Sequence, residues 1–388
     1  MAGSAQLENV GLANNCQSAW QQVATNGQAG VKISCREVAV SAGFLPAYDG
    51  ALAMKPFMPH PLLRNAHVMT LAAAMLPRIT RRLPPASPRL FETEPGTQLL
   101  AKCHWQAHPR KSPVLVVVHG LEGSCDSGYM RAIAEKAFLS GYSVLRVNQR
   151  NCGGTEGLTS TLYNSGLSGD YRAVLYELIE RDALATIFFA GYSMGGNLVL
   201  KMAGDLGSAA PPQLCGVCAV CPPLDLPACV DALDGPGNIL YRRHFVSHLR
   251  ARMKRKQRLF PGQFRMEGLD RVRTVREFDD VITAPYCGYR DAVDYYESAS
   301  ARKVMHRIAV PTLILTSQDD PFVPMATFRI PGISGNPHIN FFAPEHGGHC
   351  AFISAEAGRE RYWAEARVVE FCINRANAVA PAGSVPVF

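Results

Sequence analysis

Short apolar runs alternate with segments of mixed polarity along most of the chain, and this alternation predicts the fold class. Residues 89–105 form two extended segments around Pro95-Gly96, a pattern typical of a β-hairpin. Helix-like periodicity follows several of the apolar runs. The predicted strands are 114–120, 143–150, 186–193, 214–220, 311–320 and 338–349; the predicted helices are 129–142, 169–182, a segment after 193, and 355–376. Such alternation favours an α/β fold, with a mostly parallel central sheet and helices on both faces.

An interruption separates the strand at 214–220 from the strand at 311–320. It runs from about Pro222 to Val304 and predicts a lid-like insertion, residues 222–304, in a single domain of residues 54–380. Positions 241–258 carry eight Lys or Arg residues and no acid. We expect a solvated helix face there; the alternative is a patch that touches anionic phospholipid headgroups or acidic substrates at the periphery of a membrane.

Length and composition set limits on the class of protein. The 388 residues are 47% hydrophobic and 18% charged, which is enough for one large core. The net charge of +7 is too weak by itself to imply nucleic acid. No run approaches the roughly 18 apolar residues of a membrane span, and no secretory signal is evident, so we expect a cytoplasmic protein. Residues 1–53 show no convincing periodicity, and we expect them to be disordered or to precede a true start near Met54.

Three of the twelve cysteines, Cys215, Cys218 and Cys221, have a spacing that raises a metal hypothesis. On a regular strand, Cys218 would face away from the other two, so a shared ion would require a broken strand. We therefore expect the cysteines to act as small buried hydrophobes and free thiols. The sequence requires no metal and no organic cofactor.

The segment Gly191-Tyr192-Ser193-Met194-Gly195 matches G-x-S-x-G between a predicted strand and a predicted helix. This arrangement is the nucleophile elbow, a sharp turn that holds a serine hydroxyl above the ends of the strands. Gly191 and Gly195 leave room for the crossing backbones. The alternative is an ordinary glycine-rich turn, so partners in the right order are needed.

A nucleophilic serine needs a base, usually histidine, and a carboxylate that orients the base. Asp320 follows the strand at 311–320, and His349 follows the last predicted strand, so the order is serine, acid, histidine. We favour these two residues. The lesser candidates are Asp319 and Asp225 for the acid and His346 for the base.

An oxyanion hole needs two N–H groups aimed at the developing negative charge. Met194 supplies one N–H at the start of the helix after the serine. The loop His119-Gly120-Leu121 supplies the other, and we choose Leu121. His119 is expected to orient this loop rather than to react.

These residues resemble the α/β-hydrolase superfamily and, within it, the YheT-like branch, which is related to mammalian abhydrolase-domain lipases. The stretches "PFMPHPLLRNAHVMT", "HGLEGS", "NQRNCGG", "GYSMGGN", "FDDVITAPYCGYRDAVDYY", "PTLILTSQDDPF" and "GGHCAF" carry the likeness over about residues 55–375. Met69, Gln149 and Asn151 depart from the branch, which usually has Gln, Phe and Gly there. The resemblance implies Ser193 as nucleophile, Asp320 as acid and His349 as base.

We therefore expect a serine esterase that cleaves carboxylic esters of short- to medium-chain acids, with an ester or lipid as its small-molecule substrate. The alternatives are a phospholipase or lipase, an acyltransferase, and, last, a binding scaffold without catalysis. The sequence does not decide the oligomeric state.

Overall fold

The computed structural model describes residues 54–379, so the expectation for residues 1–53 falls outside the described residues. An eight-stranded sheet with the order β1-β2-β4-β3-β5-β6-β7-β8 forms the centre of the fold. β1 and β2 pair antiparallel, as do β2 and β4, and all later pairs are parallel. The strands are β1 (Ser87–Glu94), β2 (Thr97–His104), β3 (Val114–Val118), β4 (Ser143–Val147), β5 (Ile187–Tyr192), β6 (Leu214–Val220), β7 (Thr312–Leu315) and β8 (Ile339–Phe342).

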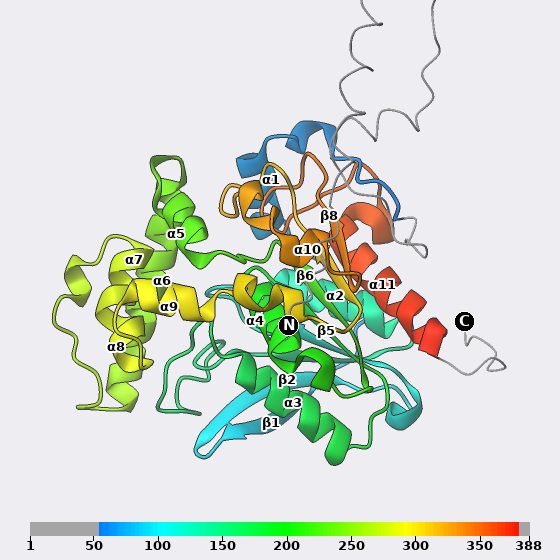
Figure 1. Ribbon diagram of the computed structural model, residues 1–388, viewed down its shortest axis with the longest axis horizontal. Coiled ribbons are helices and arrows are strands. Elements are labelled where there is room, and N and C mark those ends of the chain that lie inside the picture. The colour runs from blue at the N-terminus through cyan, green and yellow to red at the C-terminus, as the bar shows by residue number, and fades with distance from the viewer. Residues whose placement is uncertain (1–53, 380–388) are drawn as a thin grey trace, which may run out of the picture. The chain divides into compact units, whose positions relative to one another are not determined.

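Helices cover both faces of this sheet, and alternate residues of β3 show why. Val116 belongs to the apolar cluster that includes residues of α3 (Ser168–Glu180) and α4 (Met194–Leu206). Val117 belongs to the opposite cluster, with residues of α2 (Gly128–Phe138) and α11 (Trp363–Val379). Because successive side chains on a strand point to opposite faces, a strand covered on both sides has to be apolar throughout. The predicted hairpin, the mostly parallel sheet and the α/β class are confirmed (Figure 1).

The interruption between β6 and β7 is helical. Its helices gather on one side of the molecule, in the green and yellow region of Figure 1. A single π-turn, Asp279–Thr283, joins two of them. The helices are α5 (Leu226–Asp234), α6 (Ile239–Leu259), α7 (Val275–Phe278), α8 (Ala284–Tyr286) and α9 (Ala292–Ala299). We call the segment 222–304 the insertion.

The last helix begins later than the predicted 355–376, because α11 starts at Trp363. The preceding residues form a return turn instead, in which the Ser354 N–H donates to the Arg361 carbonyl. Gly358 has a φ of +65°, in the left-handed region, so a regular helix cannot continue through this residue. Two further helices lie outside the insertion, α1 (Ala66–Met75) and α10 (Pro331–Ser334).

Candidate active site

Ser193 lies on a strained turn between β5 and α4. Its φ of +50° and ψ of −123° are far from either the strand or the helix conformation. A Cβ on Gly191 would come within 2.1 Å of the Gly195 carbonyl oxygen, and one on Gly195 within 2.5 Å of the His119 carbonyl oxygen. Glycine is therefore the residue that fits at both positions, as the elbow pattern predicts. This geometry holds the Ser193 side chain at the carboxyl edge of the parallel strands.

Ser193, His349 and Asp320 form one continuous chain of hydrogen bonds. The Nε2 of His349 lies 2.9 Å from Ser193 Oγ. On the other side of the ring, Nδ1 lies 2.8 Å from Asp320 Oδ2 and 3.1 Å from Oδ1. The side chain of Asp320 is fully buried, and its Oδ1 also accepts the N–H groups of Phe322 and Val323 at 2.8 and 3.0 Å. The carboxylate is thus fixed by the turn that follows β7, and it in turn fixes the imidazole.

The electrostatics of this chain favour a basic imidazole. Burial lowers the pKa of His349, but the negative charge of Asp320 raises it, and the net pKa lies well above the usual range for histidine. The Asp320 carboxylate therefore stabilises the protonated form of the ring, which is the form that arises when the ring takes a proton from a serine.

The lesser candidates lie in supporting positions. Asp319 accepts the Gly348 N–H at 2.9 Å and lies 3.4 Å from His346, so it holds the loop that carries His349. The recorded contacts of His346 are to acids and include none to Ser193 within the described residues. Asp225 caps α5 and pairs with Arg302.

The two residues chosen for the oxyanion hole lie beside the serine. Leu121 and Met194 both line the cavity that Ser193 and His349 open into. Residues 54–379 contain no recorded hydrogen-bond acceptor for the Leu121 N–H, and the Met194 N–H is at the first position of α4, where no intrahelical acceptor exists. A Cβ on Gly120 would lie 3.0 Å from the Cβ of Ser193, so this loop passes close to the nucleophile.

His119 is a structural histidine, as expected. It is fully buried, and burial lowers its pKa to about 4, so the ring is neutral. Its Nδ1 donates to the Gly120 carbonyl at 2.8 Å, and its Nε2 accepts the Gln149 N–H at 3.0 Å. The side chain of Gln149, one of the departures from the YheT-like pattern, also donates through Nε2 to the His119 carbonyl at 2.5 Å and so helps to hold the loop before Leu121.

The cavity itself is compact and mostly apolar. Its volume is about 120 Å³, close to the ~150 Å³ of an apolar cavity that holds one benzene molecule. The ring of Phe322 packs edge-on against His349, with centroids 4.7 Å apart. Most of the remaining wall comes from the insertion, through Leu226, Cys229, Val230, Leu233, Phe245, Leu249, Val275, Phe278, Asp279, Thr283, Tyr295 and Tyr296.

The interpretation of 241–258 as a solvated face is wrong for two of its eight cations. Arg252 is buried and pairs with Glu122 at 3.0 Å, while its guanidinium lies 4.6 Å from the ring centroid of Tyr163. Lys256 is fully buried and donates to Asn151 Oδ1 at 2.6 Å. Both cations bind residues in the loops that follow β3 and β4. Two charges of α6 therefore attach the insertion to the rest of the fold.

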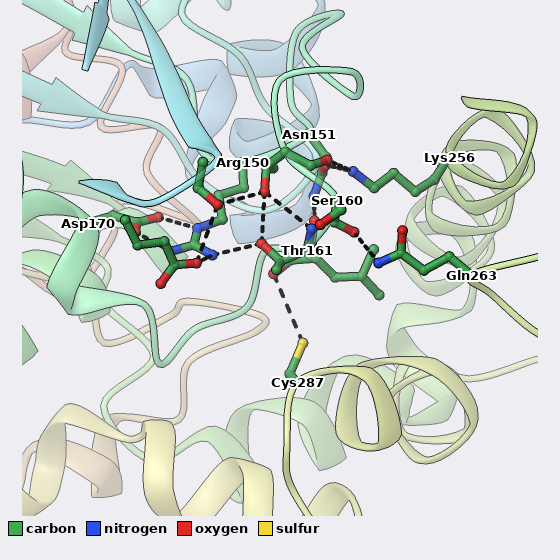
Figure 2. Close-up of polar contacts among 12 residues, drawn as sticks. Arg150, Asn151, Ser160, Thr161, Asp170, Lys256, Gln263 and Cys287 are labelled. Atoms are coloured by element: carbon green, nitrogen blue, oxygen red, sulfur yellow. Dashed lines mark hydrogen bonds and ion pairs between the residues drawn. The ribbon is translucent and has the colours of Figure 1, made fainter. Parts of the chain in front are cut away.

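Figure 2 shows where Lys256 makes this attachment. Its ammonium group points at the loop 151–161, where it also donates to the carbonyl oxygens of Glu156, at 2.9 Å, and Thr159. Asn151 has a φ of +63°, in the left-handed region that glycine adopts most easily. This conformation explains why the YheT-like branch usually has glycine at this position. Here its side chain gives a reason to keep asparagine, because it accepts from Lys256 and donates to the Thr161 carbonyl at 2.9 Å.

The prediction that Cys218 faces away from Cys215 and Cys221 is wrong, since all three pack into one apolar cluster. A register shift between β5 and β6 lies next to Cys215 and reverses its direction. Cys221 lies beyond the end of β6 at a φ of +47°. Within the described residues, the set that could hold an ion is instead Cys221, His349 and Cys350, whose ligand atoms lie within 4.8 Å of one another. Both ring nitrogens of His349 are already engaged by Ser193 and Asp320.

Sequence reasoning missed several residues of the site. Thr70, in α1, accepts the His349 N–H at 2.9 Å, and Glu122 receives both Arg252 and the Tyr163 hydroxyl. Asp279 is buried in the cavity wall. The signal for Glu122 and Asp279 was present, because both lie in the quoted stretches "HGLEGS" and "FDDVITAPYCGYRDAVDYY". The sequence did not show that the fold brings these two acids close to Ser193.

Comparison with known proteins identifies the family of the fold. The model of the α/β hydrolase fold family matches residues 113–356. YheT of Escherichia coli (strain K12) is 33% identical over 81% of this chain and 92% of its own length. "Phospholipase ABHD3" of Mus musculus is 28% identical over 62% of this chain, and "Monoacylglycerol lipase" of Saccharomyces cerevisiae is 28% identical over 65%. The matches span 58% and 57% of those two relatives, less than two thirds of each.

Solved structures support the fold alone, because their identities are low. The 2,6-dihydroxy-pseudo-oxynicotine hydrolase has a TM-score of 0.51 at 17% identity and covers 83% of this chain and 74% of its own. The esterase Pf2001 of Pyrococcus furiosus has a TM-score of 0.50 at 17% identity, over 75% and 91%. Between residues 54 and 379, no helix combines the length and the apolar character needed to cross a membrane. The family match over more than half of the sequence, together with the likeness to YheT, shows that the chain belongs to the α/β-hydrolase fold family, in its YheT-like branch.

Proposed function

We propose that this protein is a serine hydrolase that cleaves carboxylic esters through an acyl-serine intermediate. The observation that carries the proposal is the hydrogen-bonded chain from Ser193 Oγ through His349 to the buried Asp320. Ser193 attacks the ester carbonyl while His349 Nε2 takes its proton. The same proton then passes to the leaving alcohol. Water attacks the acyl-serine in a second half-reaction, with His349 again as base, and releases the acid.

The other residues have supporting roles in the proposal. Asp320 holds the Nδ1–H of His349 and stabilises the charged ring. The N–H groups of Leu121 and Met194 donate hydrogen bonds to the carbonyl oxygen as negative charge develops on it, and the loss of one such donor typically costs about 100- to 1000-fold in rate. The compact cavity favours acyl chains of short to medium length. Several relatives are named as lipases or phospholipases, which agrees with ester hydrolysis.

A fluorophosphonate probe tests the nucleophile directly, because it reacts with an activated serine. We expect one adduct on the peptide that contains Ser193, and Ser193→Ala should remove both the adduct and the turnover of p-nitrophenyl butyrate. His349→Ala is the matched control for activation, since it leaves the serine in place but should prevent labelling. Turnover that persists in folded Ser193→Ala would refute the mechanism.

A phospholipase is the second candidate, and one observation favours it. Exposed apolar side chains gather on α1, next to the loop that carries His349. Turnover that rises steeply when the same phospholipid passes from monomers to aggregates would favour this candidate. An acyltransferase would instead transfer the acyl group to an added alcohol in preference to water.

A further inference from the structure

The helix α1 has two apolar faces, and one of them has no partner within residues 54–379. Met69 and Thr70 are buried, and Met69 packs on Ala351 and Ile353. Val68, Leu71 and Met75 are exposed, and Met75 leaves 79% of its surface open. Positions spaced by three and four residues share one side of a helix, so these three form a continuous apolar face.

Exposed apolar residues also lie just before and just after the helix. Leu62, before α1, is 83% exposed, and Ile79, after it, is 67% exposed. Leu76 is exposed between them. Single exposed apolar residues are ordinary, but a cluster of six within residues 62–79 marks an interaction site. We call Leu62, Val68, Leu71, Met75, Leu76 and Ile79 the α1 patch.

Other residues of α1 connect the helix to the active site. Thr70 lies on the buried side of the same helix and accepts the His349 N–H at 2.9 Å. His67 stacks on Tyr241 with ring centroids 5.8 Å apart, and Tyr241 packs on Phe322 at 4.7 Å. Phe322 lines the cavity and contacts His349. A surface that meets α1 therefore lies beside the residues that bound the cavity.

The charged residues of the segment that carries the patch are all basic. Residues 54–91 contain six Lys or Arg residues and no Asp or Glu. Lys55, Arg78 and Arg89 pair with acids elsewhere in the domain. Arg64, Arg81 and Arg82 are exposed, and among the described residues their guanidinium groups form no ion pair, although the Arg82 backbone N–H donates to Glu135 at 2.6 Å. An apolar helix face flanked by free arginines matches the chemistry of an interfacial helix on anionic lipid.

We propose that the α1 patch docks the protein on an anionic lipid surface and presents the cavity beside it. Apolar side chains enter the boundary between headgroups and acyl chains, while Arg64, Arg81 and Arg82 meet the negative headgroups. This contact differs from the one considered for positions 241–258, because six of those eight cations have a hydrogen-bond or ion-pair partner elsewhere in the described residues. The docking concerns binding and does not require the proposed ester hydrolysis.

Vesicle sedimentation with the full chain tests the proposal. We expect binding to vesicles of phosphatidylglycerol and phosphatidylcholine in equal parts, weaker binding to phosphatidylcholine alone, and loss of binding as salt rises. Leu71→Asp/Met75→Asp should weaken binding at least tenfold. Arg81→Gln/Arg82→Gln should weaken it roughly 30-fold on anionic vesicles, at about 1 kcal/mol for each charge, and leave binding to neutral vesicles unchanged.

Val293→Asp is the matched control, because Val293 is an exposed apolar residue of another helix, α9. It should bind like the wild type. Equal loss in Val293→Asp and in Leu71→Asp/Met75→Asp would overturn the proposal, as would wild-type protein that ignores the vesicles. Loss of binding in Arg243→Gln/Arg258→Gln alone would assign the contact to α6. A dimer that Leu71→Asp/Met75→Asp dissociates, without any lipid binding, would assign the patch to a second copy of the chain. All variants are checked for folding by circular dichroism.

Discussion

Glu122 and Asp279 are buried acids beside the same cavity, but they are compensated differently. Glu122 lies between a cation and a hydroxyl, since Arg252 is 3.0 Å away and the Tyr163 hydroxyl donates at 2.5 Å. Asp279 accepts only hydroxyl groups, those of Thr283 and Tyr296, at 2.5 and 2.7 Å. Among residues 54–379, no cation is recorded within ion-pair distance of Asp279.

The difference shows that burial of an acid has two separate consequences in this domain. A paired acid ties two parts of the chain together, and removing its partner leaves an uncompensated charge. A buried acid without a cation avoids the free-energy cost of a buried charge by keeping its proton. Burial accordingly raises the pKa of Asp279 to about 7. The three predictions below separate these cases by changing one partner at a time, with Asp320 as a third case.

Asp320→Asn should have the largest effect, because Asp320 is a buried acid whose partner must change charge during turnover. We expect kcat to fall by about 10⁴-fold. Loss of the carboxylate also lowers the pKa of His349, so the acidic limb of the pH–rate profile should shift to lower pH. Stopped-flow or steady-state kinetics from pH 5 to 9 measure both effects. Asp319→Asn is the matched control and should lose far less activity; the reverse ranking would exchange the roles of the two acids.

Arg252→Met should reduce the free energy of unfolding by about 3–5 kcal/mol, because it leaves Glu122 charged in a buried place. Urea unfolding at pH 7 measures the loss. The double variant Arg252→Met/Glu122→Leu removes both charges and should recover most of it. If the double variant is as unstable as the single one, packing against Tyr163 rather than the ion pair holds the insertion here.

Asp279→Asn should have the opposite sign. Between pH 4 and 7 the folded protein binds a proton at Asp279 that the unfolded chain has released, so wild-type stability falls as pH rises through this window. The full ionisation cost is about 4 kcal/mol. An amide avoids that cost but makes one hydroxyl partner reverse its hydrogen bond, which leaves a gain of about 2 kcal/mol at pH 8.

Unfolding measured at pH 5 and pH 8 tests this sign, and Asp280→Asn is the control, since Asp280 is the exposed neighbour. A loss of stability at pH 8 in Asp279→Asn would mean that the carboxylate, and not the carboxylic acid, is what the turn requires.

The sequence predicted the sheet and the chain of Ser193, Asp320 and His349 because these depend on local patterns. Apolar runs mark buried strands, and the elbow pattern marks one turn with its own steric requirement. The attachment of the insertion was not predictable in the same way. A basic helix looks the same in sequence whether Lys256 meets water or the carbonyls of Glu156 and Thr159, because the partners lie about a hundred residues away. The prediction of the direction of the Cys215 side chain was wrong for a related reason, because a register shift depends on the neighbouring strand.

The contacts of Lys256 also bear on how this fold can be altered by design or by evolution. Lys256 of the insertion donates hydrogen bonds to the loop 151–161, and each segment depends on the other for these bonds. Gln263 of the insertion also donates to the Ser160 carbonyl (Figure 2). A chimera that imports the insertion of another hydrolase but keeps this loop would leave without a hydrogen-bond donor the carbonyl groups to which Lys256 now donates. The two segments therefore constitute one exchangeable module, and recombination between relatives should succeed when its breakpoints carry both segments across together.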